Sequence, residues 1–284
     1  MASTSIAASD ADYCAALVRR FDADRWLALL FAPAESRPAL HVLHAFNVEV
    51  ARTREQVSQA MLGEIRLQWW RETLDGVFAG TPRPQPIATA LAAVVSRFGL
   101  PRLPFDRLID AHGHDLYETP PADFPAMETY GADTSGALAE LSLAVLGALD
   151  HDSMQAARRV AVAWTMLGLA RAVPSHAKQR RIHIPADLLA REKIDAEAIF
   201  AGGDRSALVR IVASISERAN QLLSEARTFR ADRAALPLLL PAAIGDLYVR
   251  RLARAGFDPY AAALDVAGPR KQMRLFGKAL LGRF

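Results

Sequence analysis

A run of cationic side chains lies in the stretch RAVPSHAKQRRIHIPADLL (residues 171–189). Between Arg171 and Pro185 there is not one carboxylate, although the stretch contains Arg171, His176, Lys178, Arg180 and Arg181. The guanidinium group is a planar fork of donors that suits phosphate and carboxylate. The stretch follows a long apolar helical segment, so its position and its charges suggest the mouth of a site that accepts an anion.

Two alternatives stay open within this stretch. His176 is either a ligand group at the mouth or a histidine at a helix end, packed near Pro174. Arg180 and Arg181 either contact a ligand or form a solvated turn.

A second group of chemically competent residues is the sequence AHGHD, which holds His112, His114 and Asp115. Residues two apart on a helix point to different faces, so the two histidines are poorly placed to share a zinc ion. We expect one buried and one exposed histidine and no metal there. Ser135 and Ser142 lack the strand–turn–helix context of a nucleophilic serine, which excludes a hydrolase of that type.

The composition is that of an ordinary globular chain. Of 284 residues, 51% are hydrophobic and 23% charged, and the net charge is +3. No zinc-finger spacing and no basic stripe with interleaved aromatic residues is present, so we expect no nucleic-acid partner. Cys14 is the only cysteine, which excludes an intrachain disulfide and suits a reducing compartment. The N-terminus does not resemble a signal or transit peptide, and the prediction is a cytoplasmic protein.

The apolar period is helical almost throughout. Helices are predicted at about 87–98, 104–118, 126–149 and 153–172, then near 186–200, over 204–230 and over 237–255. The proline-rich connections between them are too short to be domain linkers. We therefore predict a single all-α domain over residues 1–284, with roughly ten helices and a flexible start at 1–12. The Trp69-Trp70 pair is expected to divide between surface and core, with Trp69 as a cavity wall as the alternative.

Several blocks of the chain resemble the squalene/phytoene synthase family. They are DRWLALLFAPAESRPALHVLHAFNVEVARTRE (24–55), LIDAHGHDLYE (108–118), METYGADTSGALAEL (127–141), LGLARAVPSHAKQRRIHIPADLL (167–189) and GFDPY (256–260). The resemblance implies an isoprenoid-synthase-like helical bundle around a deep apolar cavity. Members of the family join two prenyl diphosphates head to head, with Mg²⁺ held by carboxylates on two facing helices.

The positions that carry those carboxylates in the family are mostly not acidic here. They fall on Ala51, Arg52 and Glu55 in the first stretch, and on Ala172, Ser175 and His176 in the second. Glu55 is the one acid left, and we expect it to be in a salt bridge. If the two stretches face each other, a mouth without metal could bind an anion or diphosphate directly; its predicted residues are Arg52, Arg54, Glu55, Arg171, His176, Lys178 and Arg181.

Three stretches, FAPAESRPAL (31–40), MLGEIRLQWWRETL (61–74) and RAVPSHA (171–177), resemble the noncatalytic members of the family, which include a mitochondrial assembly factor of respiratory complex I. The resemblance implies a catalytically inactive protein without a cofactor, whose partner is a complex I subunit or assembly intermediate. Two alternatives remain: a carrier of an isoprenoid or phospholipid, and an active head-to-head prenyltransferase. In the latter, Glu49, Glu55, Glu64 and Asp115 would recruit Mg²⁺ in an unusual way.

The C-terminal stretch GPRKQMRLFGKALLGRF (268–284) forms a predicted basic amphipathic helix. Its apolar face holds Met273, Phe276, Leu280, Leu281 and Phe284, and its basic residues are Arg270, Lys271, Arg274 and Lys278. Such a helix can lie in the headgroup region of an anionic bilayer, which would make the protein peripheral on the inner membrane. The alternative is a terminal helix that caps the bundle, with its basic residues solvated.

Overall fold

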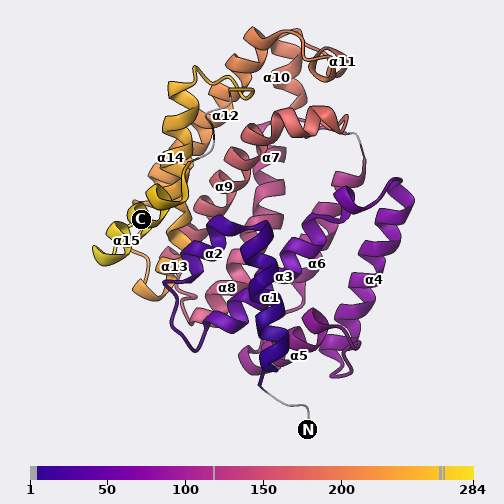
Figure 1. The fold of residues 1–284 in the computed structure, drawn as a ribbon, viewed down its shortest axis with the longest axis vertical. Coiled ribbons are helices and arrows are strands. Elements are labelled where there is room, and N and C mark those ends of the chain that lie inside the picture. Colours follow the sequence, from indigo (N-terminus) through magenta and orange to yellow (C-terminus); the bar gives the residue numbers. More distant parts are fainter. Residues whose placement is uncertain (1–4, 118, 262–263, 265) are drawn as a thin grey trace.

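The computed structural model describes residues 5–117, 119–261, 264 and 266–284, and within these residues it contains helices and turns but no strand (Figure 1). The first half comprises α1 (Ala8–Phe21), α2 (Ala23–Leu29), α3 (Arg37–Ala51), η1 (Thr53–Gln56), α4 (Ala60–Phe78), α5 (Pro86–Phe98), α6 (Leu103–Gly113), η2 (His114–Leu116), α7 (Phe124–Gly131), η3 (Ala132–Gly136) and α8 (Ala137–Leu146). The second half comprises α9 (His151–Lys178), α10 (Ala186–Arg191), α11 (Ala196–Phe200), α12 (Arg205–Ala226), η4 (Arg233–Ala235), α13 (Leu236–Leu239), α14 (Pro241–Arg254) and α15 (Gly268–Leu280). The predicted all-α class is confirmed.

The helix boundaries follow local sequence chemistry. Aspartates cap several N-termini, as at α9, where the Asp150 carboxylate accepts a hydrogen bond from the backbone N–H of Ser153 at 2.9 Å. Helices α5 and α8 end at Gly99 and Gly147, which have φ angles of 61° and 70°. Glycine adopts this left-handed conformation without strain because it has no Cβ atom. Capping signals of this kind are readable in the sequence.

Helix α9 is the centre of the bundle. Alanines and branched residues are buried along its whole length, including Ala156, Val160, Leu167 and Ala170. Helices α12, α14, α7 and α8 all pack against it, as Figure 1 shows. Because α9 has neighbours on several sides, it lacks the single apolar stripe of a surface helix.

A second packing group forms around α3, with α1, α5 and α6 as its neighbours. Its aromatic centre is Phe46, which meets Trp70 of α4 and Phe105 of α6 edge to face, at ring-centroid distances of 5.2 and 5.5 Å. Trp70 is buried and the adjacent Trp69 is half-buried, so the predicted division of the pair is confirmed.

Three predicted helices differ in their details. The segment 126–149 is interrupted by the π-helical turn η3, which marks a local widening of the helix. The segment 104–118 ends its α-helix at Gly113 and continues as the short η2. Helix α9 does not stop at 172 but runs through Pro174 to Lys178, so one proline late in the helix is tolerated.

The two ends of the chain also differ from expectation. Helix α1 begins at Ala8, so residues 8–12 belong to its first turns rather than to a flexible start, and residues 1–4 lie outside the described part. The predicted C-terminal helix is present as α15. None of the helices in the described part of the chain combines the length and apolar composition that a bilayer span requires.

Two glycines beside the π-helical turn generate a stability prediction. A Cβ atom added at Gly131 would lie 3.2 Å from the Val162 Cα of α9, where backbone cannot give way, whereas one added at Gly136 would meet its first neighbour at 3.6 Å. We expect Gly131→Ala to be less stable than Gly136→Ala by about 1–3 kcal/mol, because only the former forces α7 away from α9. Urea denaturation of the two variants measures this difference. Equal stabilities would contradict the close approach.

Candidate functional site

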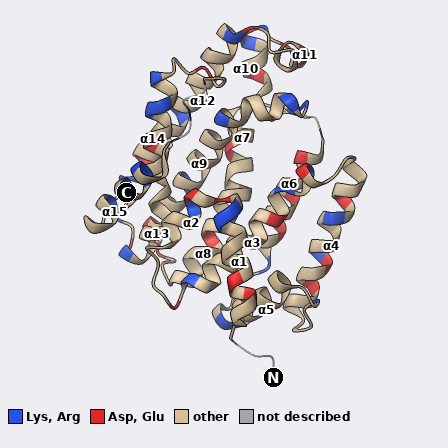
Figure 2. Ribbon diagram, viewed as in Figure 1, with Lys and Arg blue, Asp and Glu red and all other residues tan. Residues whose placement is uncertain are grey.

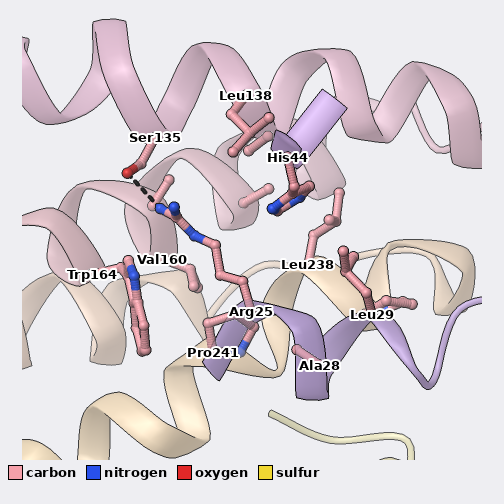
Figure 3. A pocket seen from close by; sticks show the side chains of 14 residues that line it. Arg25, Ala28, Leu29, His44, Ser135, Leu138, Val160, Trp164, Leu238 and Pro241 are labelled. Atoms are coloured by element: carbon pink, nitrogen blue, oxygen red, sulfur yellow. Dashed lines mark hydrogen bonds between the residues drawn. The ribbon is translucent and has the colours of Figure 1, made fainter. Parts of the chain in front are cut away.

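An arginine occupies the centre of the bundle. Arg25 of α2 is largely buried and extends toward η3, where its guanidinium donates to the Ser135 hydroxyl at 2.6 Å (Figure 3). The same group pairs with the Asp22 carboxylate at 3.0 Å and lies over the Trp164 ring at 5.9 Å from its centroid. The Thr165 hydroxyl of α9 donates to Ser135 at 2.7 Å. This network joins α2, η3 and α9.

His44 of α3 completes this polar centre. It is buried, and neither of its ring nitrogens has a hydrogen-bond partner among the described residues. Burial lowers the pKa of His44 well below its usual value, and the positive charge of Arg25 lowers it further. His44 is therefore neutral at physiological pH.

The space between these side chains is small. Arg25, His44, Leu138 and Trp164 are among the residues around a cavity of about 30 Å³ (Figure 3). That is room for about two water molecules, whereas pockets for small organic ligands measure about 300–1,000 Å³. This cavity beside Arg25 is therefore too small for an organic ligand.

The first predicted half of the mouth lies at the end of α3. The Arg52 guanidinium lies over the Phe21 ring, 3.6 Å from its centroid, and pairs with Glu55 at 3.4 Å. Arg54 donates to the carbonyl of Val57 at 3.3 Å. The predicted salt bridge of Glu55 is confirmed.

The second half has different surroundings. Arg171 of α9 lies over the Tyr248 ring of α14, 3.5 Å from its centroid, while Lys178 is exposed in the last turn of α9. His176 faces His183 with a ring-centroid distance of 4.5 Å. The residues predicted for one mouth therefore have several different sets of partners.

The acids considered for an unusual metal site are also engaged separately. Glu49 pairs with Arg66 at 2.6 Å, Glu64 accepts from the Tyr117 hydroxyl at 3.0 Å, and Glu55 pairs with Arg52. Among the described residues, no three His, Cys, Asp or Glu side chains come together in a way that could hold a metal ion. These residues do not fit a magnesium cluster, which needs several oxygen ligands around each ion.

A buried polar cluster lies where α6, α7 and the turn after α9 meet. Its centre is Asp115, which accepts from His112 Nδ1 at 2.7 Å and from the Tyr130 hydroxyl at 3.0 Å. Burial alone would raise the pKa of Asp115, but the hydrogen bond from His112 and the nearby positive charges lower it. An ionised carboxylate only accepts, so His112 carries its proton on Nδ1.

Arg181 and His183 extend this cluster. Arg181 donates to His183 Nε2 at 3.3 Å, and His183 Nδ1 lies 3.9 Å from Asp115. The pKa of His183 is lowered by burial, and that of His176 is lowered to about 3, mainly by burial. Neutral His183 thus presents its Nε2 as an acceptor to Arg181.

The turn that brings these groups together begins with a strained residue. Arg180 has a φ of 53°, which is unfavourable for a residue with a side chain. The N–H of Arg181 donates to the carbonyl of His176 at 2.9 Å, and that of Arg180 to the carbonyl of Ala177 at 3.0 Å. This Schellman arrangement ends α9 and reverses the chain. Arg180 itself is exposed and pairs with Glu197, so it belongs to a solvated turn, whereas Arg181 is drawn into the cluster.

The cluster forms one wall of a surface cleft of about 720 Å³. Asp115, Tyr130, Arg181 and His183 supply polar groups, and Met127, Leu169 and Ile182 supply apolar surface. Its size and mixed lining are typical of a small-molecule site. Of the AHGHD residues, His112 is buried and His114 exposed, as predicted.

Some of the residues predicted to contact a membrane are exposed to solvent, and others bind to the bundle. Arg270 and Phe276 are exposed, but Lys271 pairs with Asp24 at 2.7 Å and Arg274 with Asp246 at 3.1 Å. Lys278 donates to the carbonyl of Phe284, which also accepts from Arg227. The basic side chains expected at the bilayer are therefore largely bound to the bundle, and Phe284 is half-buried.

Comparisons with known proteins place this fold in a class. Two solved structures share it: a dehydrosqualene synthase, with a TM-score of 0.83, 18% identity and coverage of 96% of both chains, and the squalene synthase HpnC of Alicyclobacillus acidocaldarius, with a TM-score of 0.78, 22% identity and coverage of 89% of this chain and 96% of that one. The fold is that of isoprenoid synthases. The sequence profile described as squalene/phytoene synthase matches residues 18–275, and the chain belongs to that family.

Within the family, the chain is similar to proteins of two kinds. The NADH dehydrogenase (ubiquinone) complex I assembly factor 6 of Rattus norvegicus is 30% identical over 255 residues, which are 89% of this chain and 77% of that protein; the Homo sapiens protein is 27% identical over the same shares. The phytoene synthase of Rhodobacter capsulatus is 25% identical over 232 residues, 78% of this chain and 66% of the enzyme.

Sequence reasoning missed three central residues. Arg25, Tyr130 and His183 were not singled out, although each lies in a block that carries the family resemblance. Arg25 directly precedes Trp26 and the apolar residues that follow it. A charged residue at this place in a helix was the feature of the sequence that could have indicated a polar centre.

The buried neutral histidines generate a prediction about pH. His41, His44, His176 and His183 have folded-state pKa values below the ordinary value of 6.5, so the unfolded chain binds more protons below that pH. Stability is therefore fully present above pH 6.5 and falls as the pH decreases, over a window that for His176 extends to about pH 3. The protonation of His176 in the unfolded chain alone should lower the free energy of unfolding at about pH 5.5 by about 1.4 kcal/mol relative to its value at neutral pH.

The measurement is the unfolding free energy in urea at about pH 7.5 and about pH 5.5. The matched variant His176→Gln should lose less on acidification than the natural chain does. A free energy independent of pH across this interval would contradict the assignment of neutral, buried histidines.

Proposed function

We propose that this chain takes part in the assembly of respiratory complex I, the NADH:quinone oxidoreductase, as a noncatalytic member of its family. The observation that carries the proposal is the similarity to complex I assembly factor 6, at 27–30% identity over about nine tenths of the chain in four mammals. The partner would be a subunit or an assembly intermediate of complex I, at the surface of the inner membrane.

The site supports a role without prenyl transfer. Ionisation of a diphosphate needs magnesium ions held by several oxygens. At the positions that the family resemblance assigns to those acids, the chain has Ala51, Arg52, Ala172, Ser175 and His176 beside Glu55. The bundle centre is filled by Arg25 and leaves about 30 Å³, too little for a prenyl chain.

A second candidate function, the binding of an isoprenoid or phospholipid, is supported by the cleft beside Asp115. Its volume of about 720 Å³ and its mixed lining would accommodate part of an amphipathic molecule. Native mass spectrometry of the protein, purified gently from its own host, tests this candidate by the presence or absence of a bound lipid.

The assembly role is tested by deleting the gene in its own host. We expect the NADH:quinone oxidoreductase activity of isolated membranes, and the amount of assembled complex on native gels, to fall several-fold together. Succinate oxidation in the same membranes serves as the control and should not change. An unchanged amount of complex I in the deletion strain would contradict the proposal.

A matched variant separates assembly from metal chemistry. Glu55→Gln removes the last acid of the metal-ligand positions, and its salt bridge to Arg52 is half-exposed and contributes little to stability. We expect this variant to restore complex I as fully as the natural chain. A failure at normal protein levels would point to a metal-dependent activity instead.

A further inference from the structure

Helix α15 exposes an apolar face to solvent. Met273, Phe276 and Leu280 have exposed fractions of 69, 64 and 72%, and Leu281, just after the helix, has 67%. The first three follow each other at spacings of three and four residues, so they form one stripe along the helix. Large apolar side chains are seldom gathered on a free surface unless they contact something.

The opposite face explains this orientation. Leu275 is fully buried in a small apolar cluster with Ile244 and Tyr248 of α14 and Ala28 of α2. Beside Leu275, two basic side chains bind carboxylates of the bundle: Lys271 binds Asp24, and Arg274 binds Asp246. The salt bridges and Leu275 together hold α15 by its basic side and leave its apolar side outward.

The C-terminal part of the sequence, which contains the stripe, is strongly basic. Residues 247–284 contain eight Arg and Lys against two Asp, while the whole chain has a net charge of only +3. Arg250 and Arg254 on α14, and Arg270 and Arg283 at the two ends of α15, are exposed. Figure 2 shows the concentration of Lys and Arg along α14 and near the C-terminus.

We propose that the outward stripe of α15, with the exposed arginines around it, is the surface that binds an anionic lipid bilayer. The apolar side chains enter the headgroup region while the arginines are attracted to lipid phosphates. A second copy of this chain fits less well, because residues 266–284 contain no acid and a symmetric contact would bring like charges together. The inference deepens the proposed function, since the complex to be assembled lies in a membrane.

The test is cosedimentation of the purified full chain with two kinds of vesicle. One is pure phosphatidylcholine, and the other contains about one third phosphatidylglycerol, which supplies the anionic surface. We expect binding to the anionic vesicles that weakens with added salt, because screening reduces the attraction. The variant Met273→Ser/Phe276→Ser/Leu280→Ser should lower the partition on the order of tenfold or more, since three apolar side chains are lost.

The matched control removes exposed apolar side chains elsewhere. Met61 and Ile65 of α4 are 72 and 61% exposed. The variant Met61→Ser/Ile65→Ser therefore also removes exposed apolar side chains, at a place far from α15 in the sequence. Both variants should keep the melting temperature of the natural chain. The inference is overturned if the α15 variant binds as the natural chain does, if the α4 variant loses as much, or if sedimentation shows a dimer that only the α15 variant abolishes.

The outcome can be separated from that of the assembly proposal. Vesicle cosedimentation measures only whether the purified chain binds a lipid surface. The amount of complex I in the deletion strain measures only the role of the chain in the cell. A chain that restores complex I but binds neither vesicle would overturn this inference and leave the proposed function standing.

Discussion

The charge of Arg25 is the constraint on which the centre of this bundle depends. A guanidinium removed from water must be paired and hydrogen-bonded. Here Asp22 pairs with the charge of Arg25, and the Ser135 hydroxyl accepts a hydrogen bond from it. Ser135 lies in the π-helical turn and is bonded in turn to Thr165 of the central helix α9. Removal of one partner from a buried charge typically costs about 3–5 kcal/mol, so α2, η3 and α9 are held in register by this group.

The polar centre around Arg25 leaves little space for a ligand inside the bundle. The chain keeps the helical bundle of the squalene/phytoene synthase family, and the cavity beside Arg25 measures about 30 Å³. What remains available for binding is at the surface: the cleft beside Asp115 and the apolar stripe of α15. The similarity to a complex I assembly factor fits a protein that acts through contacts rather than through prenyl transfer.

The sequence was sufficient for the fold and the family, because helical periodicity and residue identity are local properties. It was not sufficient for side-chain direction. The basic residues of α15 were expected at a bilayer, but Lys271 and Arg274 bind Asp24 and Asp246, acids that no helical periodicity connects to them. The sequence also did not indicate the aromatic partners of two arginines: Arg52 lies over the Phe21 ring and Arg171 over the Tyr248 ring.

We propose that this family member performs no magnesium-dependent prenyl transfer. The most direct test of this proposal is incubation of the full chain with labelled farnesyl or geranylgeranyl diphosphate, Mg²⁺ and NADPH, beside an active phytoene synthase as a positive control. The non-acidic residues at positions 51, 52, 172, 175 and 176 and the small cavity beside Arg25 predict no squalene, phytoene or cyclopropyl intermediate above the level of a boiled sample. Product that requires Mg²⁺ and disappears with EDTA would contradict the account.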